Sequence, residues 1–278
     1  MSRTFAPAQH YDHVTSAWRH LLGDDMHYGC FLGDGDDLLE ATQNLTARMA
    51  KAAQIAPGSS VLDVGCGIGA PAIWLARQLG CLVTGISTSH VGVQIAQRQA
   101  AEQGVARCLR FLLSDGMCNG LRTGNFDYVW AMESSHLMSD KAALISEAAR
   151  VLRPGGRLAL CDVILSRSIE LVDLLTHHRE FLLLERVFGE AKMETLNTYK
   201  ELAEDAGLTV ESIEDISEAT LPTFARWRSN AYERRDAVID LIGRDGLEEF
   251  VVSCDVLERF WEQRLLGYGE LIAVKAGS

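Results

Sequence analysis

The stretch Val61-Leu-Asp63-Val-Gly65-Cys-Gly67-Ile-Gly69 decides the fold, because a short apolar run ends directly in three glycines spaced two residues apart. Residues 70–79, which follow the glycines, have the composition of a helix. Glycine allows tight turns and lets a ligand approach the backbone with no Cβ in the way. The N-terminus of the following helix presents N–H groups to a negatively polarised ligand group. The stretch therefore predicts a strand–loop–helix unit with a ligand site at the loop.

Strand-like apolar runs alternate with helix-like segments throughout residues 59–165. This alternation is typical of a parallel sheet with helices on both faces, and strands buried on both faces read as continuous apolar runs. With two further strands near the C-terminus, we predict an α/β fold with a doubly wound, mostly parallel seven-stranded sheet whose parallel strands end at one ligand-binding edge. Strands are expected at 61–64, 82–86, 109–113, 126–131, 157–164, 208–216 and 268–274, and helices at 70–79, 89–104 (N-cap Ser89) and 140–152 (N-cap Asp140).

The composition narrows the classes of function. The 278 residues carry 26 basic and 38 acidic side chains, so the net charge is −12 and contact with nucleic acid is not expected. The longest apolar runs are far shorter than a membrane span and the first residues lack the apolar core of a signal peptide, so we expect a cytoplasmic protein with no membrane contact. The seven cysteines show no zinc-ligand spacing, which argues against a metal site. The sequence does not decide whether the chain forms a homo-oligomer.

The glycine pattern separates two classes of cofactor. Dinucleotide-binding folds carry GxGxxG and an acid about 20 residues further on. This chain has GxGxG at 65–69, and its second strand is followed by Ser87 rather than by an acid. NAD and FAD are therefore disfavoured. The loop either binds another nucleoside cofactor or is a glycine turn that binds no ligand.

The chain resembles the class I S-adenosylmethionine-dependent methyltransferases. Within that class it is most similar to bacterial natural-product methyltransferases, notably the rebeccamycin-type sugar O-methyltransferases. The resemblance implies a Rossmann-like methyltransferase fold, S-adenosyl-L-methionine as cofactor and a small-molecule acceptor. It runs from about residue 10 to the C-terminus, is densest over residues 61–165, and is carried by His27–Gly29, Leu62–Gly69, Val83–Ser87, Ala131–His136 and Arg150–Gly156.

The resemblance also implies which residues hold the cofactor. Asp115 would accept a hydrogen bond from the adenine amino group, and Met117 would pack on the adenine ring. Ser87 stands where many relatives carry an acid that binds the ribose hydroxyls, and Gln94 is expected to assist it because a hydroxyl is the weaker anchor. The full implied set is Tyr28, Asp63, Gly65, Gly67, Gly69, Ser87, Gln94, Asp115, Gly116, Met117 and Ala131.

Methyl transfer to a hydroxyl needs alignment and a base. The sulfonium is already a strong leaving group, so the protein mainly aligns the reactants, and a histidine is the usual base for the hydroxyl proton. His136 follows the fourth strand, where a histidine acts as base in the resembled enzymes, although Leu137 replaces the second histidine that they often show. The resemblance also implies that Asp162, at the end of the fifth strand, orients this histidine or reaches the substrate. The alternative for His136 is a packing or capping role near Asp140.

The segments outside the alternating block are expected to enclose the site. We predict an N-terminal helical lid at 1–57 with helices at about 8–22 and 36–53, a cofactor-binding core at 58–165, an inserted helical cap at 166–207 and completion of the sheet at 208–278. One helix is expected over 170–188, and two more at about 223–241 and 247–265. The acceptor pocket is expected to involve Tyr11, Trp18, His177, His178 and Phe181.

Several functions fit this scaffold. The favoured function is O-methylation of a hydroxyl on a small secondary metabolite, with His136 as general base. The alternatives are C-methylation of a prenyl diphosphate or other alkene, N-methylation of an amine, and a non-catalytic cofactor-binding module. C-methylation would use Glu133 or Asp162 to take the proton, and Mg²⁺ would be needed only for a diphosphate. Four arginines have two possible roles: they would clamp a diphosphate, or they would form a solvated helix face. They are Arg226, Arg228, Arg234 and Arg235.

Overall fold

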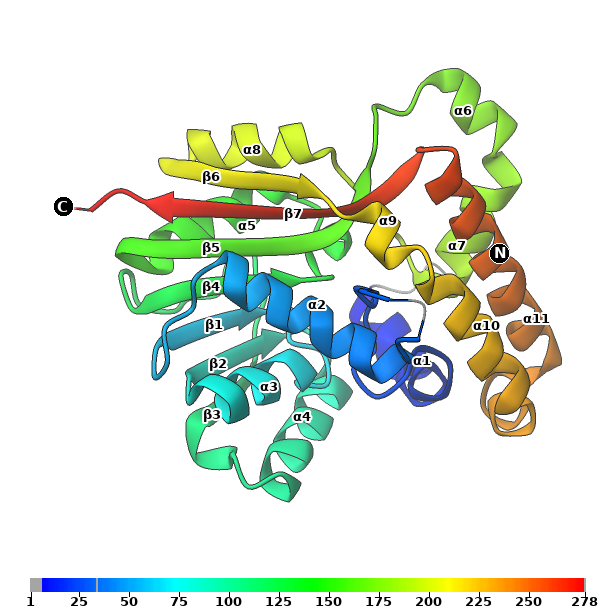
Figure 1. Cartoon of the computed structure of the whole chain (residues 1–278), viewed down its shortest axis with the longest axis horizontal. Helices are drawn as coiled ribbons and strands as arrows, with labels where there is room; N and C mark the ends of the chain where they lie inside the picture. The colour runs from blue at the N-terminus through cyan, green and yellow to red at the C-terminus, as the bar shows by residue number, and fades with distance from the viewer. Residues whose placement is uncertain (1–6, 34, 278) are drawn as a thin grey trace.

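The predicted seven-stranded, mostly parallel sheet is confirmed. The computed structural model describes residues 7–33 and 35–277, with side chains described from Thr15 onward. The strand order is β3-β2-β1-β4-β5-β7-β6, and β7 runs antiparallel to its neighbours β5 and β6 (Figure 1). The chain moves outward from β1 to β3 and then returns to β4, so the order reverses between β1 and β4. Ligands bind at such a reversal, outside the carboxyl ends of the strands.

The strands lie close to their predicted positions. Val61 and Leu62 of β1 are fully buried, as expected for a central parallel strand covered on both faces. The observed bounds are Ser60–Val64 (β1), Leu82–Ser87 (β2), Leu109–Leu113 (β3), Phe126–Met132 (β4), Leu152–Leu165 (β5), Leu208–Asp215 (β6) and Leu266–Lys275 (β7).

Helices cover both faces of the sheet. One face packs against α2 (Leu38–Ala52), α3 (Ala70–Leu79) and α4 (His90–Glu102), and the other against α5 (Lys141–Val151) and α8 (Leu196–Asp205). The predicted caps are present, because Ser89 accepts a hydrogen bond from the Gly92 N–H at 2.9 Å and Asp140 accepts one from the Ala143 N–H at 2.8 Å. These caps fix where α4 and α5 begin.

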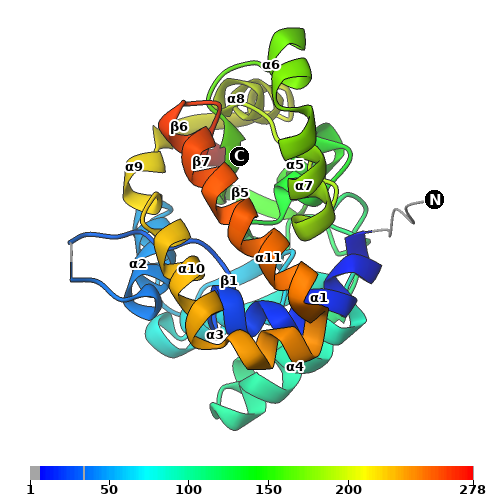
Figure 2. The same cartoon turned by 90° about the vertical axis from the view of Figure 1, so that its right-hand side faces the viewer.

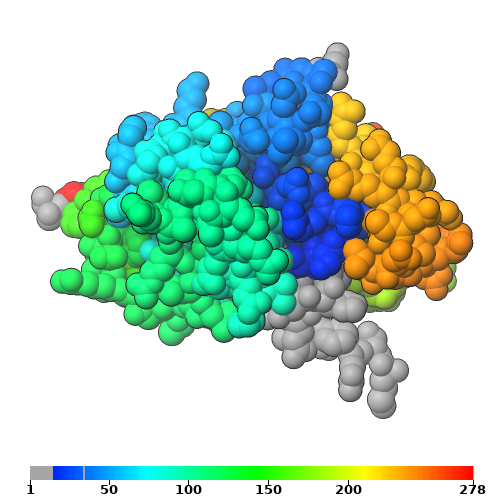
Figure 3. Space-filling view, turned by 90° about the horizontal axis from the view of Figure 1, so that it is seen from below, coloured from blue at the N-terminus to red at the C-terminus, as the bar shows by residue number. Residues whose placement is uncertain are grey.

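The remaining helices form a cap at the carboxyl ends of the strands (Figures 1 and 2). Its members are α1 (Pro7–Leu22), α6 (Leu171–Thr176), α7 (His178–Phe188), α9 (Ser217–Thr220), α10 (Thr223–Glu233) and α11 (Arg235–Glu262). Buried aromatic rings of α10 and α11 belong to the same hydrophobic cluster as the sheet face covered by α2–α4, and α1 packs against both helices. Figure 3 shows the dark-blue α1 between the sheet domain and the orange helices α10 and α11.

The cap therefore differs from the predicted boundaries. Helices α9–α11 come from the connection between β6 and β7, within the segment 208–278 that was assigned to completion of the sheet and not to the cap. Helix α8, expected in the cap, packs on the sheet against α5, β6 and β7. The helix predicted over 170–188 is broken at His177 (φ −107°, ψ 16°), whose ring packs on Phe260. The long C-terminal helices separate at Arg234, and Gly243 (φ 77°) interrupts α11.

The glycine that begins α3 offers a test of this packing. Gly69 has a left-handed φ of 85°, and a Cβ there would lie 2.8 Å from the Cβ of Ala96. We expect Gly69→Ala to lower the free energy of unfolding by about 2–4 kcal/mol, because left-handed strain adds to overpacking. Urea denaturation measures the loss. Gly80→Ala is the matched control: its φ is 63° but nothing lies within 4 Å, so about 1 kcal/mol is expected, and equal losses would contradict the packing argument.

Candidate active site

A cavity of about 720 Å³ lies where the strand order reverses. One side is formed by the loops after β1, β2, β3 and β4, and the other by residues of α1, α7, α10 and α11. The sequence prediction that the parallel strands end at the ligand site agrees with this position. The cavity is deep and mostly apolar, which is the usual character of a small-molecule site.

The three glycines of the loop after β1 have different surroundings. All three have positive φ: 78° at Gly65, 51° at Gly67 and 85° at Gly69. A Cβ on Gly65 would lie 2.2 Å from the Cβ of Ser134, so this glycine permits the loops after β1 and β4 to touch. Gly67 has nothing within 4 Å and faces open space in the cavity. Gly69 does not line the cavity and instead lets α3 approach α4 and β3, which differs from its expected contact with the cofactor.

Asp63 supplies an unusual polar group beside the glycine loop. Its side chain is 2% exposed, and its Oδ2 is buried with no hydrogen-bond partner. Burial raises the pKa of this carboxyl to about 7. Because an unpartnered buried carboxylate is costly, the position favours a ligand that brings positive charge or N–H donors.

The other predicted cofactor residues divide into two groups. Ser87, Asp115, Gly116, Met117 and Tyr28 line the cavity with Asp63. The Asp115 carboxylate accepts from the Met117 N–H at 2.8 Å, which fixes the turn after β3. Two expected residues do not line the cavity: Gln94 is exposed on α4, and Ala131 is buried inside β4.

Several apolar lining residues were not singled out from the sequence. Four of them, Cys66, Ile68, Met132 and Met138, lie within two residues of a predicted position, so the motifs carried their signal. Leu184, Phe188 and Leu257 lie further from any predicted position, and no motif indicated them. Gly116 shows why Met138 matters, because a Cβ on this glycine would lie 2.9 Å from the Met138 methyl carbon.

His136 and Asp162 form a pair at the end of β4 and β5. The His136 Nδ1 lies 2.6 Å from Asp162 Oδ1, and the His136 backbone N–H donates to Asp162 Oδ2 at 3.0 Å. His136 lines the cavity, whereas Asp162 is fully buried behind it. The structure therefore brings these two predicted residues together in the arrangement in which the carboxylate orients the histidine.

Burial and charge oppose each other in this pair. Burial disfavours the charged form of His136, but the charge and hydrogen bond of Asp162 outweigh it and raise the histidine pKa above its ordinary value. Burial likewise raises the pKa of Asp162, but the same partner and further donors outweigh it and lower that pKa. The carboxylate is therefore ionised, and it supports a protonated imidazole.

Glu133 occupies the turn immediately after β4. Its backbone has a left-handed φ of 47°, which is uncommon for a residue other than glycine or asparagine. Its Oε1 accepts from the Tyr28 N–H at 2.7 Å and from the Tyr268 hydroxyl at 2.6 Å. Burial raises the pKa of this carboxyl. Glu133 lines the cavity and links the N-terminal segment to the sheet.

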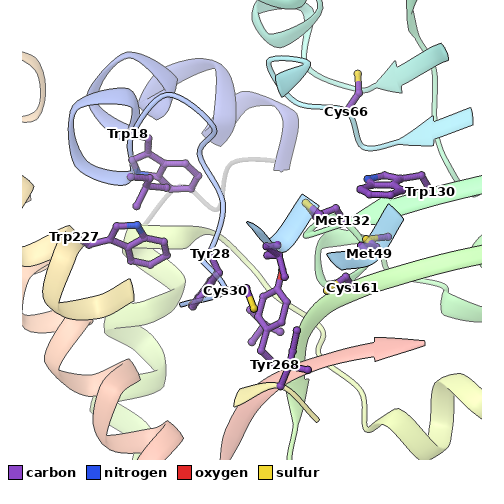
Figure 4. Close-up of a cluster of buried hydrophobic side chains, with 14 of the residues drawn as sticks. Trp18, Tyr28, Cys30, Met49, Cys66, Trp130, Met132, Cys161, Trp227 and Tyr268 are labelled. Carbon is purple, nitrogen blue, oxygen red and sulfur yellow. The ribbon is translucent and has the colours of Figure 1, made fainter. Parts of the chain in front are cut away.

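Aromatic side chains form the wall of the cavity on the cap side (Figure 4). The Tyr28 ring centroid lies 4.8 Å from that of Trp227. It also lies 5.1 Å from that of Tyr268, which is fully buried in β7 and does not line the cavity. The Trp18 and Phe188 centroids are 5.9 Å apart. These contacts make a stiff apolar surface that suits the body of an organic acceptor.

The predicted pocket residues of the cap have mixed positions. Trp18 and Phe181 line the cavity. His177 and His178 do not: the ring of His177 packs on Phe260 and pairs with Glu180, and His178 is exposed. Tyr11 lies in α1, where its side chain is outside the described residues.

The arginines of α10 and α11 lie away from the cavity. No arginine lines it within the described part of the chain. Arg226 donates to the Asp36 carbonyl oxygen. Arg228 pairs with Asp255 at 3.1 Å and Glu258 at 2.8 Å. Arg234 and Arg235 lie around a shallow surface depression instead.

The fold and the site together define an S-adenosylmethionine-dependent methyltransferase. The chain belongs to the mycolic acid cyclopropane synthetase family, whose model matches residues 2–263. It is 34% identical over 265 residues to the 27-O-demethylrifamycin SV methyltransferase of Amycolatopsis mediterranei, and the match covers 95% of each protein.

Two solved structures extend the comparison. The cyclopropane synthase MmaA2 from Mycobacterium tuberculosis matches with a TM-score of 0.87 and 18% identity over 99% of each chain, which is a likeness of fold. The [4+2]-cyclase SpnF matches with a TM-score of 0.82 and 27% identity over 98% of this chain and 96% of that one. Since these relatives are named for different activities, membership fixes the class of protein and leaves the acceptor to be argued from the site.

The residues present fit S-adenosylmethionine. Gly67 leaves the backbone uncovered, and the unpartnered Asp63 oxygen beside it suits a cofactor with a cationic sulfonium and N–H donors. Within residues 7–33 and 35–277, no helix is long and apolar enough to span a membrane. The same residues contain no group of histidine, cysteine and acidic side chains arranged to hold a metal ion.

The raised pKa of Asp63 predicts a pH-dependent stability of the cofactor-free protein. The folded chain holds a proton that the unfolded chain releases above its ordinary pKa of 3.8, so the free energy of unfolding falls as pH rises toward about 7. Between pH 5 and pH 8 this contribution is about 2–3 kcal/mol. Asp63→Asn should remove it, as measured by urea denaturation at both pH values.

Asp115→Asn serves as the matched control, because Asp115 is an exposed carboxylate at the same cavity. The free energy of unfolding of Asp115→Asn should depend on pH in the same way as that of the unmodified protein. The same slope in Asp63→Asn as in the control would show that the buried carboxyl does not titrate in this range.

Proposed function

We propose that the enzyme methylates a hydroxyl group on a small secondary metabolite, with His136 as general base. One observation supports this assignment: His136 lines the cavity while its Nδ1 is engaged by the buried Asp162 carboxylate. The second ring nitrogen, Nε2, is therefore the one that serves an acceptor hydroxyl. The reaction class of the rifamycin relative, an O-methylation by its name, agrees with this proposal.

The proposed roles of the residues follow from their positions. When bound, S-adenosylmethionine supplies a methyl group that is already activated by its positive sulfur. The glycine loop, Ser87 and Asp115 hold the nucleoside part, and Asp63 lies beside the loop. His136 accepts the hydroxyl proton on Nε2, and Asp162 stabilises the resulting imidazolium. The aromatic wall excludes water and holds the acceptor in line.

The lining of the cavity favours a bulky apolar acceptor over a diphosphate. The cap side offers Trp18, Phe188, Trp227 and Leu257, and Lys192 is the single lysine or arginine among the described lining residues. A diphosphate would need several cationic partners at the cavity. C-methylation of a prenyl diphosphate, with or without Mg²⁺, is therefore not favoured. We further propose that the enzyme works in the cytoplasm. Assembly of the chain into a homo-oligomer stays a prediction.

Removal of the proposed base gives the first test. His136→Ala should lower kcat about 10²- to 10⁴-fold while the dissociation constant of S-adenosylhomocysteine stays unchanged, because the side chain moves a proton and does not hold the nucleoside. Labelled methyl transfer measures kcat, and calorimetry measures binding. His178→Ala is the control, since His178 is exposed and outside the cavity, and its rate should be unchanged. Full activity of His136→Ala would exclude this base.

The pH dependence and an acceptor panel complete the test. Only neutral His136 can take a proton, so kcat/KM should rise with pH through a pKa above the ordinary value of 6.5. The panel contains glycosides, phenols and macrocyclic polyketide alcohols, with geranyl and farnesyl diphosphates tested with and without Mg²⁺. Turnover of the diphosphates alone would contradict the proposed acceptor class, and turnover of hydroxyl acceptors would support it.

A further inference from the structure

Hydrogen bonds continue behind Asp162 into the interior of the protein. Ser135 Oγ lies 2.5 Å from Asp162 Oδ2 and 2.7 Å from the hydroxyl oxygen of Tyr199. The side chains of Ser135, Asp162 and Tyr199 are all 0% exposed. Tyr199 lies on α8, which covers the face of the sheet rather than the cavity. A chain of polar groups thus connects a helix outside the site to the proposed base.

The Asp162 carboxylate is fully used by four donors. Its Oδ1 accepts from His136 Nδ1 at 2.6 Å and from the Val163 N–H at 2.7 Å. Its Oδ2 accepts from Ser135 Oγ at 2.5 Å and from the His136 N–H at 3.0 Å. An ionised carboxylate offers about four lone-pair positions, so each is occupied. The two backbone donors fix the plane of the carboxylate, and the two side-chain donors occupy its remaining positions.

The direction of every proton in this chain follows from that count. Ser135 has one hydroxyl hydrogen, and the ionised carboxylate can only accept, so this hydrogen goes to Asp162. Ser135 Oγ must then accept from Tyr199, whose phenol keeps its proton because burial raises its pKa. At the other end, His136 Nδ1 must donate to Asp162. The neutral imidazole therefore carries its proton on Nδ1, and its lone pair on Nε2.

We propose that Tyr199 and Ser135 are positioning residues for His136, acting in series through the Asp162 carboxylate to set the tautomer and proton affinity of the imidazole. This proposal rests on the proposed role of His136 as base. Tyr199 strengthens the donation by Ser135, and Ser135 draws negative charge toward Oδ2 and away from the oxygen that faces His136. Hydrogen bonds that satisfy a carboxylate weaken its pull on a neighbouring proton.

The backbone of His136 is held from both sides, which makes the side-chain effect separable. Its N–H donates to Asp162, and its carbonyl oxygen accepts from the Lys192 N–H at 2.7 Å. Removal of one hydroxyl leaves these two bonds in place. Other charges around the pair come from the end of β4, from α5 and from the loop before α8; they belong to Glu133, Lys141, Lys192 and Glu194. The variants below alter none of them.

The test measures the pKa of His136 directly, by NMR titration of protein that contains isotope-labelled histidine. The signal of His136 is assigned among the eight histidines from its loss in His136→Asn. Ser135→Ala should raise the pKa of His136 by roughly 0.5–1 pH unit, because the carboxylate then attracts the imidazolium more strongly. Tyr199→Phe should raise it by a smaller amount. Both replacements keep the size of the buried side chain.

Two controls sharpen the result. Tyr128→Phe removes a tyrosine hydroxyl that donates to the Gln54 carbonyl oxygen at 2.8 Å, on a part of β4 remote from Asp162, and should leave the pKa of His136 unchanged. In the double variant Ser135→Ala/Tyr199→Phe, the tyrosine change should have no further effect, because its path runs through Ser135. Unchanged or lowered pKa values in both single variants would overturn the proposal, as would additive shifts.

The titration separates this proposal from the proposed function. If His136→Ala keeps full activity, His136 is not the base, but the NMR shifts still report whether Tyr199 and Ser135 control its proton affinity. If His136→Ala is inactive and the single variants leave the pKa unchanged, the base role stands and the positioning role fails. If both proposals hold, the acidic limb of the pH–rate profile of Ser135→Ala should shift to higher pH by the same amount as the pKa of His136 measured by NMR.

Discussion

The contact between the loops after β1 and β4 is the constraint on which the site depends. A Cβ on Gly65 would lie 2.2 Å from the Cβ of Ser134, so only glycine allows the two loops to meet. The Ser134 hydroxyl also donates to the Val64 carbonyl oxygen at 2.6 Å. Because Ser134 lies two residues before His136, this contact sets the separation between the glycine loop and the proposed base. Alignment of reacting atoms is the main contribution that the protein makes to this chemistry.

The core was predictable from sequence because its signals are local. Ser89 and Asp140 begin their helices by accepting hydrogen bonds from N–H groups three residues later, so a cap can be read without knowledge of the fold. Strand β3 has the predicted bounds, 109–113, where three leucines and a phenylalanine precede the polar residues Ser114 and Asp115. The pairing of His136 with Asp162 was expected from the resemblance to the sugar O-methyltransferases, and the rule that parallel strands end at a common edge agrees with it.

The features that differ from prediction depend on contacts between distant segments. The helix break at His177 accompanies packing on Phe260, which no local pattern near residue 177 records. Gln94 points away from the cavity although Gly92 lines it, because residues two apart on a helix do not share a face. Gly69 is equivalent to Gly67 in the motif, yet Ala96 and Phe111 approach it and the cavity does not. Such differences appear only when the packed neighbours are known.

The cap consists of pieces that are separate in the chain: α1 before the sheet, α6 and α7 after β5, and α9–α11 between β6 and β7. Each piece joins the scaffold at a different strand, while the opposite side of the cavity is built from the loops after β1–β4. Acceptor preference can therefore change through the cap without altering the loops after β1–β4. A chimera that transfers the acceptor preference of a relative would have to exchange all three pieces together, since their buried aromatic rings interlock.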